Sequence, residues 1–206
     1  MSIARLKITL DDVKPAVVRR IEVPLAIKLS ELHLVIQVTM PWWNYHLYEF
    51  RFRGVGWGIP DPGFGFGDGP LDARKVTLLD VLEDTGAKSL KYLYDFGDGW
   101  EHAVKIEKIV EADPGATYPR LLDAKGRCPP EDVGGPWGYP DFLEAIADPK
   151  HARHAEMIAW RGPGFDPETV DIADIEKNLA KFAQKMTSKA AKPTRKTKRQ
   201  KSPRAE

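Results

Sequence analysis

The residues of this chain that could do chemistry gather around one glycine-rich turn. Three acids and a histidine lie on or beside it, and two more acids follow in a later loop: Asp95, Asp98, Glu101, His102, Glu131 and Asp132. Carboxylate oxygens with one imidazole nitrogen suit Mg²⁺, Mn²⁺ or Ca²⁺, and such an ion can support phosphodiester hydrolysis. The sequence therefore offers these five carboxylates as ligands of a divalent ion, with His102 as a general base and Asp95 as a second catalytic candidate.

The turn joins two strands, and their register decides where these acids point. Apolar and polar residues alternate on both sides of the turn, which is typical of half-buried strands. A three-residue loop at 97–99 would pair Phe96 with Trp100 and unite the apolar faces, and the hydrophobic pattern normally sets the register. That pairing places Asp95 opposite Glu101, where facing like charges destabilise a sheet. With Asp98 at the tip, we expect the turn to need a cation, a proton or water.

Structural roles explain the same residues without an ion, and the sequence favours them. Asp98 can bond its own turn backbone, and the acids at 131 and 132 can cap loop N–H groups. The arginine pair at 19–20 can neutralise the acids at 95 and 101. His102, on the apolar side of its strand, can be a hydrogen-bonded core histidine.

Cys128 is a candidate nucleophile, with His46 or His102 as its base. Two prolines follow it, so no helix N-terminus comes directly after it to stabilise a thiolate. The sequence favours a buried loop cysteine instead. As the single cysteine of the chain, it also excludes an internal disulfide and a multi-cysteine zinc site.

Aromatic residues concentrate in two further segments. Core packing is the simpler role for most of them, but aromatics on a sheet with mobile loops can also stack on bases or anchor a protein. The sequence predicts a partner-binding surface at the edge 42–45 and in the glycine- and proline-rich loop 127–139, formed by Trp42, Trp43, Tyr45, Trp137 and Tyr139.

Charge divides the 206-residue chain into an acidic body and a basic tail. Of the 31 Lys and Arg and the 30 Asp and Glu, residues 185–206 hold nine basic residues and one acid, which leaves 22 basic and 29 acidic residues in 1–184. We expect a folded domain over 1–184 and a disordered tail over 185–206, because the tail has no aromatic residue and too little apolar surface to bury. The tail can attract phosphate backbones of DNA or RNA without sequence specificity, through Lys192, Arg195, Lys196, Lys198, Arg199 and Lys201.

The order of elements predicts an α+β domain. Period-two alternation indicates strands at 3–10, 17–23 and 45–52, and apolar spacing indicates helices after Ser30 and after Asp171. The full order, β-β-α-β-(β)-α-β-β-α-α-α, is typical of a curved, mostly antiparallel sheet with helices on one face, as in a β-grasp or α/β roll. We expect a cytoplasmic protein, since no apolar run approaches the roughly 20 residues of a membrane span and the N-terminus lacks a signal-peptide layout.

Four motifs in order resemble the plasmid pRiA4b ORF-3-like family, whose members are also named IS1096 element passenger TnpR-like proteins. They are HLYEF (46–50), YDFGDGWEH (94–102), CPPEDVGGPWGY (128–139) and GFDPE (164–168). The resemblance implies an α/β-roll domain found in plasmids, mobile elements and bacterial chromosomes, and implies no particular activity. A recombinase would need an arginine cluster around a Ser or Tyr nucleophile, and Arg19–Arg20 is the only tight arginine pair in the body. The sequence therefore predicts a non-enzymatic binding module, with a metal-dependent phosphodiester hydrolase as the alternative.

Overall fold

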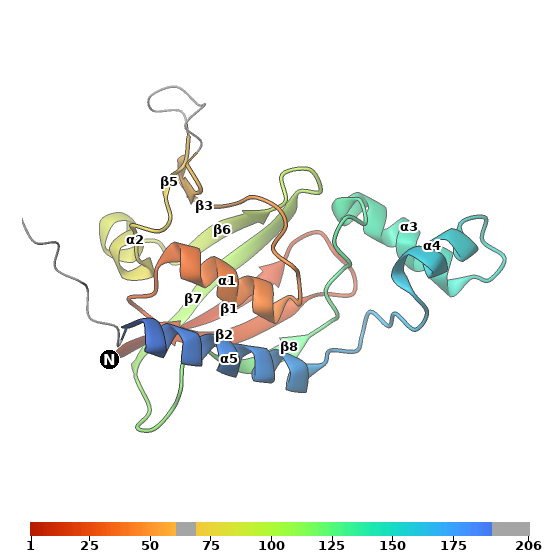
Figure 1. Cartoon of the computed structure of the whole chain (residues 1–206). Helices are drawn as coiled ribbons and strands as arrows, with labels where there is room; N and C mark the ends of the chain where they lie inside the picture. The colour runs from red at the N-terminus through yellow and green to blue at the C-terminus, as the bar shows by residue number, and fades with distance from the viewer. Residues whose placement is uncertain (61–68, 191–206) are drawn as a thin grey trace, which may run out of the picture.

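The computed structural model describes residues 1–60 and 69–190, with side chains described as far as Met186. This part of the chain forms eight strands and five helices (Figure 1). The strands are β1 Ser2–Leu10, β2 Val18–Pro24, β3 Tyr48–Phe52, β4 Val55–Gly58, β5 Leu71–Asp72, β6 Ser89–Tyr94, β7 Trp100–Glu111 and β8 Arg120–Lys125. The helices are α1 Leu29–Thr39, α2 Leu78–Thr85, α3 Gly135–Ala147, α4 His154–Arg161 and α5 Ile172–Ala190.

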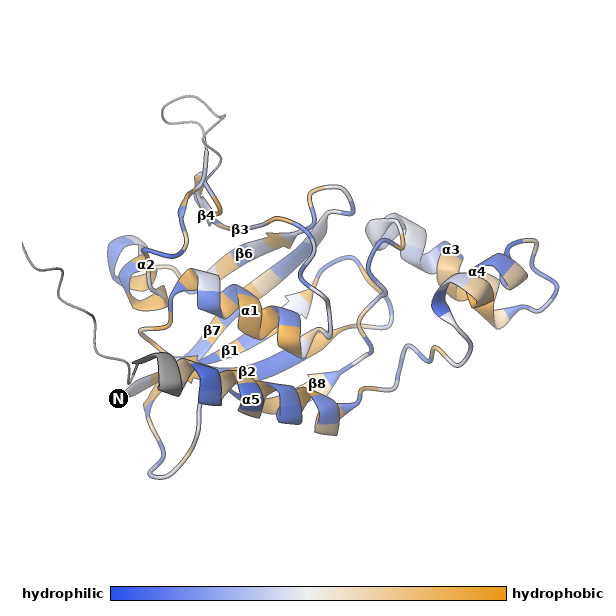
Figure 2. Ribbon diagram, in the orientation of Figure 1, coloured by the Kyte–Doolittle hydropathy of each residue, from blue (hydrophilic) through white to orange (hydrophobic). Residues whose placement is uncertain are grey.

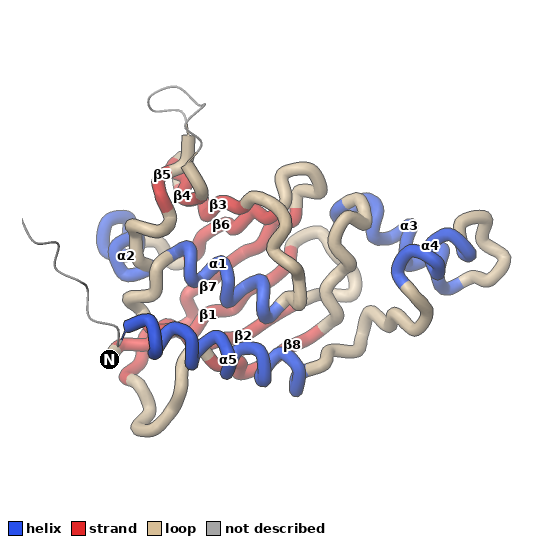
Figure 3. Tube along the Cα trace, viewed as in Figure 1, coloured by secondary structure: helices blue, strands red, loops and turns tan. Residues whose placement is uncertain are grey.

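The strands form a single sheet in the order β5-β4-β3-β6-β7-β1-β2-β8. Every neighbouring pair in it is antiparallel except β4 and β5. Helices α1 and α5 lie side by side across one face of this sheet (Figures 1 and 3). The predicted α+β class, with a mostly antiparallel sheet and helices over one face, is confirmed.

Hydrophobic burial explains this layering. On β1, Leu6 and Ile8 are fully buried, whereas Arg5 and Lys7, which alternate with them, are half-buried. Helix α1 places its own buried residues, at 29, 32, 35 and 36, in the same core (Figure 2). Each large aliphatic side chain removed from water stabilises the fold by roughly 1.5–3 kcal/mol. No described helix is both long enough and apolar enough to cross a membrane.

The β6–β7 hairpin differs from the predicted one by two positions. Tyr94 pairs with Trp100, so the connection spans residues 95–99 rather than 97–99. The apolar faces still meet, because a shift by two leaves each side chain on its original side of the sheet. Phe96 does not take part in the β6–β7 pairing and is 53% exposed, contrary to its predicted pairing with Trp100.

Several boundaries depart from the sequence patterns. The edge strand β8 and the two-residue β5 were not predicted. Glycine and proline content predicted an irregular loop over 127–139, but α3 begins inside it: Pro136 lies in the first turn, where a missing N–H is harmless, and Gly138 N–H donates to the Gly134 carbonyl (2.9 Å). Helix α5 continues to Ala190, so residues 185–190, which composition assigned to the tail, are helical.

Helices α3 and α4 form a small lobe beyond the end of the sheet rather than on its face (Figure 1). Aromatic packing holds the lobe together, with the Phe142 ring centroid 5.3 Å from that of Phe165 and 5.9 Å from that of Trp160. The loop that leaves β8 and the loop that leads to α5 connect the lobe to the sheet, and Arg127 N–H donates to the Pro167 carbonyl (2.8 Å) between them.

Candidate metal centre

Three loops from distant parts of the sequence meet at the β6–β7 turn. They are the α1–β3 loop, the turn itself and the loop between β8 and α3. The Trp42 indole N–H donates to the Pro129 carbonyl (2.9 Å), and Trp43 N–H donates to Glu131 Oε2 (2.7 Å). On the other side, Gly134 N–H donates to Asp98 Oδ2 (3.3 Å). These contacts hold the three loops against one another and place their side chains in a common site.

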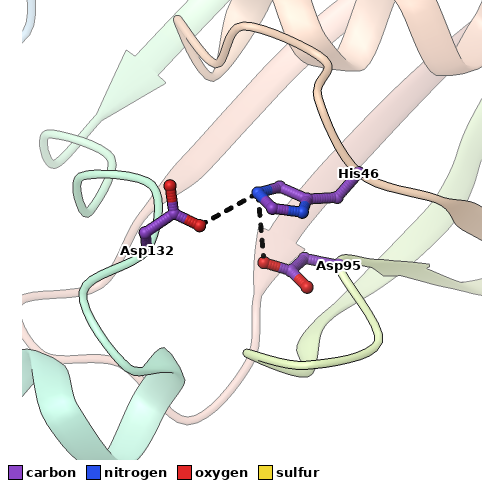
Figure 4. Close-up of side chains that lie close together, drawn as sticks. All are labelled: His46, Asp95 and Asp132. Carbon is purple, nitrogen blue, oxygen red and sulfur yellow. Dashed lines mark ion pairs between the residues drawn. The ribbon is translucent and has the colours of Figure 1, made fainter.

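One side chain from each loop forms a histidine–carboxylate cluster (Figure 4). His46 Nε2 lies 3.0 Å from Asp132 Oδ1 and 3.5 Å from Asp95 Oδ2. The three ligand atoms all lie within 4.8 Å of one another. His46 Nε2 is shielded from solvent and lies at ion-pair distance from both carboxylates, but it makes no hydrogen bond with any described residue. A buried nitrogen left in this condition is unusual and calls for an explanation.

Left-handed backbone conformations aim these side chains at one point. Asp95 has φ 57°, Asp132 has φ 60°, and Asn44, two residues before His46, also has φ 60°. Non-glycine residues adopt this region rarely, with Asp and Asn the most tolerant. Two residues of the cluster and a near neighbour of the third adopt this conformation, which is a reason to ask for a function, since strained backbone concentrates at ligand and active sites.

Asp95 divides its two oxygens between the turn and the cluster. Its Oδ1 accepts from Gly97 N–H (2.9 Å) and Asp98 N–H (3.3 Å), and Gly99 N–H donates to its main-chain carbonyl (2.7 Å). Its Oδ2 faces His46, and its side chain is only 10% exposed. The role of turn acid that the sequence assigned to Asp98 therefore belongs to Asp95, and this hydrogen bonding explains the longer loop.

Asp98 lies beside the cluster as a third carboxylate. Burial raises its pKa above the ordinary 3.8, and the charges of Asp95 and Asp132 raise it further, while N–H groups of Gly135 and Gly134 oppose the shift. Gly135 has φ 68°, and a Cβ there would collide with the Asp98 carbonyl oxygen. Only glycine allows α3 to begin this close to the turn.

Glu131 supports the cluster without facing it. It accepts hydrogen bonds from Trp43 N–H and from the Tyr94 hydroxyl, and burial together with this contact raises the pKa of Tyr94. The Tyr94 hydroxyl also accepts from Tyr45 N–H (3.1 Å). The predicted role of Glu131 as a cap for loop N–H groups is confirmed. Glu131 was also predicted as an ion ligand, but it is not part of the histidine–carboxylate cluster.

Glu101 points to different partners. Leu93, not Asp95, lies opposite it, so the predicted facing pair of acids is wrong. Lys91 Nζ lies 3.4 Å from Glu101 and 2.6 Å from Asp11, and lysine therefore neutralises this acid. The predicted neutralisation by the arginine pair is also wrong: Arg20 pairs with Glu107, and the buried Arg19 bonds main-chain carbonyls.

His102 and Cys128 are core residues. His102 is fully buried, with Nδ1 close to the carbonyls of Tyr92 (3.2 Å) and Trp100 (3.1 Å), and burial lowers its pKa to about 4. An enclosed imidazole reaches no substrate, which removes His102 as a general base. Burial raises the pKa of the Cys128 thiol to about 12, so this cysteine stays protonated, as a structural residue would.

The predicted partner surface divides into exposed and buried aromatics. Trp43, Tyr45 and Trp137 are 72%, 73% and 87% exposed. Trp42 and Tyr139 are buried in the core and cannot contact a partner in this conformation. Leu47 and Phe96, which the sequence did not single out, are 54% and 53% exposed on the same loops as His46 and Asp95. The six tail residues predicted to bind nucleic acid, 192–201, lie outside the described residues.

The distances from His46 Nε2 to the two carboxylate oxygens fit a transition-metal ion. Two atoms each about 2.1 Å from one ion, at roughly 90–110° to each other, lie about 3.0–3.4 Å apart, close to the two measured separations from His46 Nε2. An imidazole with two carboxylates suits Mn²⁺ or Zn²⁺ better than Ca²⁺, which prefers an all-oxygen shell. His46 was missed as a ligand because its position, in a loop far from the acidic turn, carries no spacing signal.

Comparison with known proteins supports the resemblance noted in the sequence. The family model described as plasmid pRiA4b ORF-3-like protein matches residues 2–174. A protein of Sinorhizobium fredii (strain NBRC 101917 / NGR234), named uncharacterized protein y4hQ, is 55% identical over 194 residues, which cover 94% of this chain and 98% of that protein. The crystal structure of the protein of unknown function MM3350 from Methanosarcina mazei Go1 superposes with a TM-score of 0.74 at 34% identity, covering 86% of this chain and 97% of that one.

Proposed function

Because this chain belongs to the plasmid pRiA4b ORF-3-like family, whose relatives' names specify no reaction, we propose a function from its own geometry: a divalent-cation-binding interaction module. His46, Asp95 and Asp132 hold the ion, and the exposed aromatics beside it contact the partner. The observation that carries this proposal is the buried Nε2 of His46, which has no hydrogen bond and faces two carboxylates at 3.0 and 3.5 Å. A bound ion satisfies that nitrogen and neutralises both acids.

The partner in this proposal is single-stranded nucleic acid. Three protein ligands leave positions on the ion for phosphate oxygens, as divalent ions in nucleotide sites commonly have. Trp43, Tyr45 and Trp137 supply exposed rings on which bases can stack. The Lys- and Arg-rich sequence of the tail adds affinity for phosphates that depends on salt and not on base sequence.

Two titrations test this module. Calorimetry with Mn²⁺ on the ion-free protein should give one site, and His46→Ala should abolish it, whereas His151→Ala, which removes a histidine from the far lobe, should bind as the wild type does. Fluorescence anisotropy with a labelled single-stranded oligonucleotide should then show tighter binding with Mn²⁺ than with EDTA. A wild-type protein that takes up no Mn²⁺ would refute the cation site.

The aromatic and tail contributions are separable in the same assay. Trp43→Ala and Trp137→Ala should each weaken binding by roughly five- to a hundredfold, since stacking contributes about 1–3 kcal/mol per base. Leu122→Ala, an exposed apolar residue on β8, is the matched control. A chain ending at residue 190 should lose much of the salt dependence and keep the Mn²⁺ dependence. Equal affinity of the tryptophan variants and the wild type would remove the nucleic-acid partner while leaving the cation site in place.

Hydrolysis of a phosphodiester is the second candidate, and the raised pKa of Asp98 favours it. An ion held by His46, Asp95 and Asp132 would acidify a bound water, which would release its proton to bulk solvent as it attacks phosphorus. The acid form of Asp98, which its raised pKa favours, would donate a proton to the departing oxygen. His102 has no part in this scheme because it is buried. Release of nitrophenol from bis(nitrophenyl) phosphate with Mn²⁺, compared between wild type and Asp98→Asn, tests it, and no release by the wild type would exclude it.

A further inference from the structure

A cavity lies between the sheet and the α3–α4 lobe. Its volume is about 730 Å³, within the usual range for small-molecule sites of roughly 300–1,000 Å³. Asp132 lies on its wall, so the cavity opens beside the cation site, but the other two ion ligands do not line it. The apolar part of the wall comes from Met40, Pro41, Trp42, Pro129, Val170 and Ile175.

Two of the arginines that line this cavity form no ion pair among the described residues, although Asp166 lies near enough to Arg127 for the arginine's charge to help lower the pKa of that carboxyl. Arg127 and Arg161 form neither an ion pair nor a side-chain hydrogen bond with any residue in the described part of the chain. Both guanidinium groups instead lie over the ring of Phe165, at 4.7 and 5.6 Å from its centroid. Burial lowers the pKa of Arg161, and the charge of Arg127 lowers it further, as expected for neighbouring cations. Like charges held together in this way favour an anion between them.

The ring that carries the two arginines is held firmly. Phe165 meets Phe142 edge-on, with ring centroids 5.3 Å apart, and also meets Tyr139, with centroids 6.4 Å apart. The main chain of Arg127 is tied to the same loop through Pro167. This support pre-orients Arg127 and Arg161, which lowers the entropy lost when a ligand binds.

The acids on the cavity wall are already engaged elsewhere. Asp171 accepts from Asp174 N–H (2.9 Å) at the start of α5, and Asp174 accepts from the Asn178 side chain (3.0 Å). Glu131 is held by Trp43 and Tyr94, and Asp132 faces His46. Among described residues, no ion pair joins any of these four acids to Arg127 or Arg161, so both guanidinium groups can donate to a ligand, although the acids add negative charge to the same wall.

We infer that this cavity binds a small organic phosphate monoester, with its phosphate between Arg127 and Arg161 and its apolar group against the Trp42 side of the wall. A dianionic phosphate balances two guanidinium charges, and planar guanidinium groups match its oxygens in charge-assisted hydrogen bonds. The site goes beyond the cation-binding function and does not depend on it, because the arginines need no metal to attract an anion.

Calorimetry of the full chain in EDTA with naphthyl phosphate tests the site. Binding should be measurable, and Arg127→Gln and Arg161→Gln should each weaken it at least about tenfold, which is about 1.4 kcal/mol. Arg153→Gln is the matched control, because Arg153 lies in the same lobe but pairs with Glu156 and does not line the cavity. Naphthol, which lacks the phosphate, and inorganic phosphate, which lacks the rings, should both bind more weakly.

The possible results separate cleanly. If the wild type does not bind naphthyl phosphate, or if both arginine variants bind it as tightly as the wild type does, the proposed site is overturned. If naphthol binds with the same affinity as naphthyl phosphate, the role of the arginines is overturned. If naphthoate equals naphthyl phosphate, the proposed ligand class is wrong. Thermal unfolding of each variant shows whether it is folded, and use of EDTA keeps failure of this site distinct from failure of the cation site.

Discussion

Asp95→Asn tests the cation site most directly, because Asp95 has one structural oxygen and one that faces the cluster. Asparagine keeps an acceptor for the N–H groups of Gly97 and Asp98, so the turn should persist. The change removes one negative charge from a side chain that is only 10% exposed and 3.5 Å from His46 Nε2. The substitution therefore separates ion binding from folding.

The expected loss of Mn²⁺ affinity follows from that charge. At an effective dielectric of about 20, unit charges 4 Å apart interact by about 4 kcal/mol, and the ion carries two. The outer side of the site is open, with Asp132 65% exposed, so solvent screening reduces this value. A residual loss of about 2.7 kcal/mol, or roughly a hundredfold in Kd, is expected.

Stability should change in opposite directions with and without the ion. In EDTA, Asp95→Asn should be at least as stable as the wild type, because it removes repulsion among neighbouring carboxylates, the same repulsion that helps to raise the pKa of Asp98. With saturating Mn²⁺ the wild type should become the more stable protein, since an ion that binds only the native state stabilises it.

Calorimetry and thermal unfolding measure these two effects. Asp84→Asn, which removes an exposed acid from α2, is the control for net charge. If Asp95→Asn binds Mn²⁺ as the wild type does, or if it unfolds in EDTA well before the wild type does, the assignment of Asp95 Oδ2 as a ligand is refuted.

Three further predictions concern the surroundings of the site and the core. Gly135→Ala should destabilise the protein by more than the roughly 1 kcal/mol expected from its positive φ alone, because the new Cβ meets the Asp98 carbonyl. Gly164→Ala, at a residue with φ 77° and open space around it, is the control in urea unfolding. Equal losses of unfolding free energy in the two variants would contradict the predicted collision. Asp98 binds its proton more tightly in the native state than in the unfolded chain, so its contribution to stability is present below pH 3.8 and lost as the pH rises through the raised pKa. Asp98→Asn should therefore stabilise the ion-free protein near neutral pH, with a gain that shrinks toward pH 3.8, and a pH-independent effect would contradict this. His33 and His102 are buried with pKa values lowered to about 4. Their unfolded forms take up protons below 6.5 while the native forms do not, so the unfolding free energy should fall as the pH drops from 6.5 toward 4, by up to roughly 1.4 kcal/mol per pH unit for each histidine; NMR titration of imidazoles that already charge near 6.5 would refute it.

Local pattern was sufficient for most of the fold. Alternation of apolar residues predicted the paired first two strands and the β6–β7 hairpin, because a strand with one buried face must repeat every second residue. It could not distinguish hairpin registers two positions apart, since both unite the same faces. The hydrogen bonds that Asp95 makes to its own turn decided between them.

The sequence patterns did not predict the edge strand β8 or the start of α3, for a related reason. Strand β8 has no fully buried residue, so its sequence shows no clear alternation of apolar and polar residues. The start of α3 lies in a segment whose glycines and prolines predict a loop, and it is helical because Gly135 packs closely against the β6–β7 turn. Such a contact between distant segments has no trace in local composition.

The sequence by itself determined the α+β class, the family and the presence of acids at one turn, since each depends on residue order alone. Only the tertiary structure decided which side chains meet there. Asp95 and Asp132 lie in one cluster with His46, which comes from the loop between α1 and β3. Glu101 instead forms an ion pair with Lys91. The physical reason is that the cluster depends on left-handed loop residues held by hydrogen bonds from distant segments, and those bonds exist only after the chain has folded.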